Sequence, residues 1–263
     1  MAAEVWVTDA TAVTALGRNL EELWQQLLSG HSAIAPVERF SVKGYKSRFA
    51  ACIEDLNCRG PLSAIHDLLG RLYKEMGPIP TDARLYTATT KSGIDNLERL
   101  RRDEPVDTSD ILVDAIAKRV SRQLGLICTG TNISAACASS TIAVAKGAAL
   151  IAAGRAECVL ICCIDLVTEF VFSGFSALGA LSPKPCMPFD RERSGLTLGE
   201  GAASVLLMKA DRAKKEGRPH LGTVLGWGVA NDAFHVTAPA SDGRGLLAAV
   251  KKALKRAGLE PDV

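Results

Sequence analysis

The chain has 263 residues, of which 48% are hydrophobic and only 5% aromatic, and its formal net charge is +2. This length and hydrophobic content suffice for a large buried core, arranged as one large domain or two smaller ones. Because basic and acidic residues nearly cancel, the composition argues against nucleic acid or an anionic membrane surface as a partner.

Residues 1–10 lack the positive segment and long apolar run that are typical of a signal peptide. The longest stretch without charge, residues 123–145, contains hydroxyl and amide side chains that a membrane span would not normally carry. None of the eight cysteines is in CxxC spacing, and no Cys/His cluster has the spacing of a zinc site. We therefore expect a soluble, cytoplasmic protein with reduced thiols and no bound metal.

The hydrophobic pattern predicts strands that alternate with helices along the chain. In chain order, strands are expected at residues 4–7, 48–56, 83–90, 129–137, 158–167, 199–208 and 220–232. Helices are expected at residues 20–28, 62–76, 109–124, 138–153, 210–217 and 243–259, and Asn19 with Glu22 forms a capping arrangement at the first of them. This alternation predicts the α/β class with a largely parallel sheet.

Two of these helices have distinctive faces. The helix at 138–153 consists of Ala, Gly, Ile, Val, Leu, Ser and Thr, with Lys146 as its one charge, so we expect it to be sandwiched between layers. The helix at 243–259 is amphipathic, and its leucines and valine are expected to point inward: Leu246, Leu247, Val250 and Leu254.

Cys137 lies where a predicted strand turns into the helix at 138–153. The unpaired N–H groups and partial positive charge of a helix amino terminus stabilise a thiolate. The small neighbours Ala136 and Ala138 leave room for a substrate, so the position suits nucleophilic catalysis on a thioester. The alternative is that Cys137 is a small buried packing residue, as free cysteines often are.

Two blocks of sequence resemble motifs of the β-ketoacyl synthase family. Residues 132–154, NISAACASSTIAVAKGAALIAAG, are similar to its active-site block, in which an Ala-Cys-Ala-Ser/Thr nucleophile precedes a buried helix. Residues 188–208, PFDRERSGLTLGEGAASVLLM, are similar to its Pro-Phe-Asp-x-x-Arg-x-Gly…Gly-Glu-Gly-Ala motif. The matching positions in the second block include Phe189, Asp190, Arg193, Gly199, Glu200 and Gly201.

The resemblance implies a thiolase-like fold, whose full form has five αβαβα layers. Residues 1–220 are expected to form the first half, and residues 221–263 the opening strand and helix of a truncated second half. Cys137 is then the acyl-accepting nucleophile of a decarboxylative Claisen condensation in fatty-acid or polyketide synthesis, and its own N–H lines the oxyanion hole. The resemblance implies no metal or redox cofactor, because the phosphopantetheine of an acyl carrier protein carries the substrate.

The resemblance also predicts what is missing. Members of the family continue into a His-Gly-Thr motif, a lysine, a second histidine and a Gly-Phe-Gly loop, none of which occurs here. We expect structural roles for the four histidines of this chain: His31, His66, His220 and His235. The missing groups are then expected from a homodimer, from a complementing subunit or from the remainder of the same gene product, and the incomplete second half is expected to expose apolar faces.

Glu200 is expected to pair with a neighbouring group and to be structural. Two other functions stay open at this point. One is a non-catalytic subunit like the chain-length factors, although those lack the nucleophilic cysteine. The other is an acyltransferase or thioester hydrolase that uses Cys137 without condensation.

Overall fold

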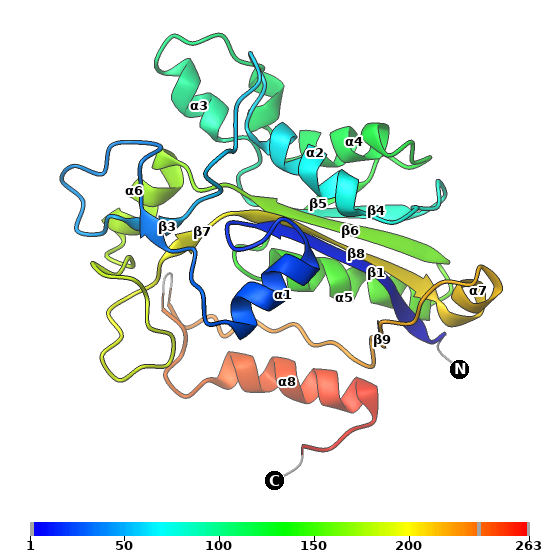
Figure 1. Ribbon diagram of the computed structural model, residues 1–263. Helices are drawn as coiled ribbons and strands as arrows, with labels where there is room; N and C mark the ends of the chain where they lie inside the picture. Colours follow the sequence, from blue (N-terminus) through cyan, green and yellow to red (C-terminus); the bar gives the residue numbers. More distant parts are fainter. Residues whose placement is uncertain (1–2, 236–237, 262–263) are drawn as a thin grey trace.

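The computed structural model describes residues 3–235 and 238–261, and it is built on a six-stranded sheet with helices on both faces (Figure 1). The strands of this sheet lie in the order β5-β4-β6-β8-β1-β9. Their bounds are β1 (Val5–Thr14), β4 (Arg84–Ala88), β5 (Thr131–Ile133), β6 (Cys158–Asp165), β8 (Gly201–Lys209) and β9 (Gly222–Thr223). A smaller sheet contains β2 (Ala35–Pro36), β3 (Phe49–Ala51) and β7 (Leu198–Gly199).

The helices form layers above and below the large sheet. On one face lie α2 (Ile65–Glu75) and α4 (Ala115–Gln123), with α3 (Asp95–Leu100) and the 3₁₀ turn η1 (Thr108–Ile111) beside them. The opposite face carries α5 (Ser139–Ala152), and α8 (Arg244–Ala257) lies beyond it (Figure 1). The remaining helices are α1 (Leu20–Leu28), α6 (Glu169–Ala177) and α7 (Ala210–Lys215). None of the helices in the described ranges has the length and hydrophobicity that crossing a membrane requires.

The large sheet is mixed, so the expectation of a largely parallel sheet was wrong for half of its strands. Strands β4, β5 and β6 are parallel, but β8 is antiparallel to both β6 and β1. Asp165, the last residue of β6, pairs with Gly201, the first residue of β8. The chain therefore leaves β6 and returns to the sheet at the same end, after passing through α6 and the smaller sheet, and this connection reverses the strand direction.

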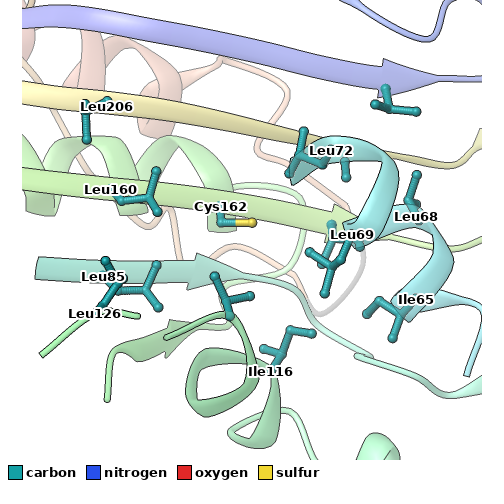
Figure 2. Packing of buried hydrophobic residues seen from close by; sticks show 14 of the residues in the cluster. Ile65, Leu68, Leu69, Leu72, Leu85, Ile116, Leu126, Leu160, Cys162 and Leu206 are labelled. Carbon is teal, nitrogen blue, oxygen red and sulfur yellow. The ribbon is translucent and has the colours of Figure 1, made fainter. Parts of the chain in front are cut away.

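The central strand β6 is buried on both faces by alternating side chains. Leu160 and Cys162 belong to the cluster that β6 forms with α2 and α4, which also contains Leu69 and Ile116 (Figure 2). Val159 and Ile161 on the same strand pack on the other face against α5. This burial on both faces explains why the sequence of β6 is a continuous apolar run.

Helix α5 packs closely on the sheet through its smallest residues. A Cβ atom at Gly147 would lie 3.1 Å from Val159, 3.2 Å from Ile161 and 3.3 Å from Leu207. The expectation that α5 is sandwiched between layers fits its burial, because beyond its first turn Lys146 is the one exposed residue of α5. Val224 and Trp227, from the segment before α8, pack on the same cluster as α5.

Helix α8 also differs from the expectation, because its large apolar residues face outward. Leu246 is 72% exposed, and Leu247 and Val250 are exposed as well. The helix instead meets the chain through its small residues, since a Cβ at Gly228 would lie only 1.8 Å from the Ala249 carbonyl oxygen. The side of α8 with small residues lets the backbone near Gly228 approach more closely than the side with leucines would. The helix therefore turns its small residues toward the rest of the chain.

Several predicted elements are shorter or divided. The helix expected at 109–124 is η1 followed by α4, and the strand expected at 220–232 contains only the two residues of β9. Helices α3 and α6 were not predicted. Thr168 caps α6 by accepting a hydrogen bond from the Val171 amide. This capping residue was the signal in the sequence that marks the start of α6.

Leu160→Ala is expected to lower the free energy of unfolding by about 3 kcal/mol, because it leaves a cavity where β6 meets α2 and α4. Leu246→Ala, at an exposed position of α8, is the matched control and should change stability by less than about 0.5 kcal/mol. Urea unfolding followed by circular dichroism compares the two. Equal effects of the two substitutions would contradict the packing described here.

Candidate active site

The carboxyl ends of the three parallel strands meet at one edge of the large sheet. Ala88 of β4 pairs with Ile133 of β5 on one side and with Cys163 of β6 on the other. We call the residues at these three strand ends the carboxyl edge: residues 89–91, 134–137 and 165. In open α/β sheets this is the edge at which ligands usually bind.

Cys137 lies in a tight turn between β5 and α5, residues 134–139, which we call the nucleophile turn. Its thiol is exposed, and α5 begins two residues later at Ser139. This exposure excludes the alternative that Cys137 is a buried packing residue. The preceding residue, Ala136, has φ +50°, a left-handed conformation that a residue with a Cβ atom adopts at some cost.

Ser139 holds the nucleophile turn from within. Its side-chain Oγ accepts a hydrogen bond from the Ala135 amide at 2.8 Å and donates one to the Ala136 carbonyl oxygen at 2.6 Å. The backbone supports the same shape, because the Ala138 amide donates to the Ala135 carbonyl at 3.2 Å. Sequence analysis did not assign this role to Ser139, and its place two residues after Cys137 was the available signal.

A network of polar side chains joins the three strands at the carboxyl edge. Thr89 donates from its hydroxyl to Asp165 at 3.1 Å, and its carbonyl oxygen accepts from the Asn132 side chain at 3.0 Å. Thr87 in turn donates to the Asn132 side-chain oxygen at 3.0 Å. Desolvation raises the pKa of Asp165, and the Thr89 hydrogen bond acts in the opposite direction. Sequence analysis missed these residues because their strands are adjacent only in the fold.

The other cysteines differ from Cys137 in their surroundings. Burial raises the pKa of Cys52 and of Cys163 to about 11, and that of Cys158 to about 12. A thiol with so high a pKa carries almost no thiolate at neutral pH and is a poor nucleophile. Cys58 is exposed, but partial desolvation raises its pKa too, and the nearby Asp95 adds to this effect.

Glu200 is buried and fully engaged in hydrogen bonds. Its carboxylate oxygens accept from the Arg39 guanidinium at 2.6 Å each, from the Ile53 amide at 2.6 Å and from the Val167 amide at 3.0 Å. The expected pairing of Glu200 is therefore present, and the carboxylate is committed to structure. Arg39 was not identified from the sequence, because nothing local marks a partner 161 positions away.

The two glycines that flank Glu200 lie in tight backbone pairings. Gly199 of β7 pairs with Ala51 of β3, and Gly201 begins β8 opposite Thr14. A Cβ atom at Gly201 would come within 2.8 Å of the Val13 carbonyl oxygen, so this position requires glycine. Three strand spacings separate β8 from β5, which puts Gly201 about 14 Å from the strand that leads to Cys137.

The rest of the second motif forms an exposed loop. Phe189 is 100% exposed with φ +64°, and Asp190 and Arg193 are also exposed. Arg193 donates to the Asp190 carbonyl oxygen at 3.0 Å, which closes the loop on itself. The structure therefore separates the predicted site residues. Cys137 is on the carboxyl edge, and Glu200 is buried between β7 and β8 in the chain. Phe189, Asp190 and Arg193 are exposed to solvent.

Three of the four histidines have contacts that lie outside the nucleophile turn. His66 of α2 is 2.9 Å from Asp110, and His220 stacks on Trp6 at a ring-centroid distance of 4.2 Å. His31 contacts Ser29 at 3.1 Å, and His235 is exposed. Over residues 3–235 and 238–261, no three His, Cys, Asp or Glu side chains are grouped as a metal site requires.

Glu200→Gln is expected to lower the free energy of unfolding by about 3 kcal/mol, because it leaves the buried side of Arg39 without its charged partner. Glu192→Gln, in the exposed loop, is the control and should leave stability unchanged. Thermal and urea unfolding measure both variants. An unchanged free energy of unfolding in Glu200→Gln would show that the Arg39–Glu200 ion pair does not stabilise the fold.

Comparison with protein families finds one match, to the model described as the N-terminal domain of β-ketoacyl synthases, over residues 81–213. The chain is similar to 3-oxoacyl-[acyl-carrier-protein] synthase 2 of Vibrio cholerae, at 27% identity over 97% of the chain and 70% of that relative. It is also similar to the synthase of the same name from Rhizobium meliloti, at 28% identity over 97% of the chain and 70% of that relative.

Solved structures with the same fold include ketosynthases. The ishigamide ketosynthase/chain length factor matches with a TM-score of 0.87 and 24% identity, over 99% of the chain and 71% of that chain. A ketosynthase from Xenorhabdus doucetiae, solved in complex with its chain length factor, matches with a TM-score of 0.80 and 22% identity, over 98% and 69%. The identities are low, so these structures establish the fold, which is the thiolase-like fold of ketosynthases.

Proposed function

The chain belongs to the β-ketoacyl synthase family, and we propose that it is a ketosynthase chain that accepts an acyl group on Cys137. One observation carries the proposal: the Cys137 thiol is exposed at the amino end of α5, on the carboxyl edge of the sheet. The match to the family model includes this residue, as well as Glu200 and the loop before it. The pathway in which the chain acts is fatty-acid or polyketide synthesis.

The first step is acyl transfer from the phosphopantetheine thioester of an acyl carrier protein. The Cys137 sulfur attacks the thioester carbonyl carbon, a new C–S bond forms, and the carrier's sulfur leaves and takes up the proton. The Cys137 amide, directly before the amino terminus of α5, would hold the developing oxyanion. This step needs neither a resident metal nor a redox cofactor, because all the groups involved are thiols and thioesters.

The second step is decarboxylative condensation with a malonyl thioester, and it needs proton-transferring groups beside Cys137. The contacts of His66 and His220 with Asp110 and Trp6 place these rings away from the nucleophile turn. We therefore propose that the histidines come from outside these 263 residues, either from a complementing ketosynthase subunit or from a further part of the same gene product, because a second copy repeats the same four histidines. The Xenorhabdus ketosynthase solved with its chain length factor supports a two-subunit arrangement.

Two other functions are weaker. A non-catalytic subunit like a chain length factor is consistent with the fold, but an exposed thiol in a strained, braced turn has no purpose there. An acyltransferase or thioester hydrolase that uses Cys137 alone is favoured by the position of the histidines. The two steps of the proposal separate these functions, because only a ketosynthase condenses the bound acyl group.

Incubation with a short acyl-pantetheine thioester is expected to add one acyl group to the purified chain, as measured by intact mass. Cys137→Ala should abolish the adduct, because it removes the nucleophile. Cys58→Ala, at the other exposed thiol, is the matched control and should be acylated like the wild type. An adduct that persists in folded Cys137→Ala, or its absence from the wild type, would overturn the proposal.

These 263 residues by themselves are expected to release no ketoacyl product from malonyl-pantetheine after acylation, because the proposed histidines lie outside them. Mass spectrometry measures both the released small molecules and the acyl group that remains on the enzyme. Product formation by these residues alone would contradict the need for histidines from elsewhere. Steady release of free acid would instead identify a thioester hydrolase.

A further inference from the structure

We propose that Ser139 is a positioning residue, whose hydroxyl sets the direction in which the Cys137 thiol is presented. The inference rests on the proposed function, because it concerns acyl transfer to Cys137. It starts from the two hydrogen bonds of the Ser139 side chain, one accepted from the Ala135 amide and one donated to the Ala136 carbonyl oxygen. These two partners immediately precede Cys137 in the chain.

The direction of these hydrogen bonds distinguishes Ser139 from a helix cap. A capping serine precedes the helix and accepts from an amide further along in its first turn. Ser139 is instead the first residue of α5, and its hydroxyl bonds backward into the nucleophile turn. The cap position itself is Ala138, which makes no side-chain hydrogen bond. The hydroxyl therefore acts on the turn that carries Cys137.

The turn needs such a constraint because its backbone is strained. Ala136 has φ +50°, and a left-handed residue with a Cβ atom costs about 1 kcal/mol relative to its relaxed conformation. Ser139 is only 5% exposed, so water does not readily replace its hydroxyl at the Ala135 amide or the Ala136 carbonyl. Without the hydroxyl, two backbone hydrogen bonds of 3.2 Å remain, from the Ala138 amide to Ala135 and from the Ser139 amide to Ala136. The turn is then held more weakly against its strain, and the thiol direction is less well fixed.

The strand before the turn is held independently. Asn132 of β5 accepts from Thr87 and donates to the Thr89 carbonyl oxygen, so β5 keeps its place beside β4. Helix α5 after the turn is packed on the sheet through Gly147. With both flanks anchored, the hydroxyl of Ser139 determines the conformation between them.

Attack on a thioester requires the sulfur to approach the carbonyl carbon along a narrow path, while the oxyanion meets its donors. A misplacement of about 1 Å can cost about 100-fold in such a reaction. Alkylation by iodoacetamide has no such requirement for an oxyanion donor. A positioning role therefore predicts that losing the hydroxyl slows acylation far more than alkylation.

The test compares Ser139→Ala, Ser139→Thr and Ser140→Ala in the full chain. Ser139→Ala is expected to slow acylation of Cys137 by a short acyl-pantetheine thioester at least 10-fold, and alkylation by iodoacetamide less than 3-fold. Ser139→Thr keeps the hydroxyl and is expected to restore the acylation rate. Ser140→Ala, at the exposed neighbouring position, is the control and should match the wild type in both reactions.

A companion variant separates positioning from stability. In Ala136→Gly/Ser139→Ala, glycine accepts the left-handed conformation without strain, so the stability lost with the hydroxyl is recovered. We expect acylation to stay slow in this variant, because glycine also reaches conformations that alanine does not, and no hydroxyl selects the one that presents the thiol. Recovery of both stability and acylation rate would overturn the inference, and the double variant replaces Ser139→Ala if the latter does not fold.

The outcomes distinguish this inference from the proposed function. A wild-type chain that takes up no acyl group contradicts the proposed function itself. A wild-type chain that is acylated at Cys137, together with a Ser139→Ala variant acylated within 3-fold of it, contradicts the positioning role alone. Equal slowing of acylation and alkylation also contradicts it, because the hydroxyl would then affect access to the thiol.

Discussion

The carboxylate of Glu200 is the junction on which the site depends. It accepts hydrogen bonds from Arg39, Ile53 and Val167, so one buried charge connects the segments on both sides of β3 and the chain after β6 to the start of β8. Removing one partner of such a pair leaves an uncompensated charge in a poorly solvated place, so the loss of either side chain is expected to destabilise this connection strongly. The carboxyl end of β6 is fixed as a result, and with it the edge at which Cys137 lies.

The geometry of the nucleophile turn combines strain with bracing. The left-handed conformation of Ala136 turns the chain away from the direction of β5 just before Cys137. The buried Ser139 hydroxyl holds this turn through its hydrogen bond with the Ala135 amide. Cys163 lies on β6, two strand positions from β5, and is partly buried against the core, where burial raises its pKa to about 11. The two cysteines near one sheet edge thus differ in their exposure to solvent.

The local signals in the sequence were sufficient for most elements. The continuous apolar run of β6, the capping pair at α1 and the small residues of α5 each predicted the right structure, because each depends on neighbours within a few positions. Helix α8 was oriented wrongly, since its packing depends on how closely Gly228 approaches Ala249.

By itself, the sequence determined the family to which the chain belongs and the strand–turn–helix that carries Cys137, the proposed nucleophile. These features are encoded in contiguous residues, so local pattern is enough to reveal them. Only the tertiary structure decided that Arg39 neutralises Glu200 and that Thr89 and Asn132 connect the three strand ends. It also placed Phe189 in solvent, away from Cys137. Hydrogen bonds and burial join residues that are distant in sequence, and no local pattern specifies which distant partners will meet.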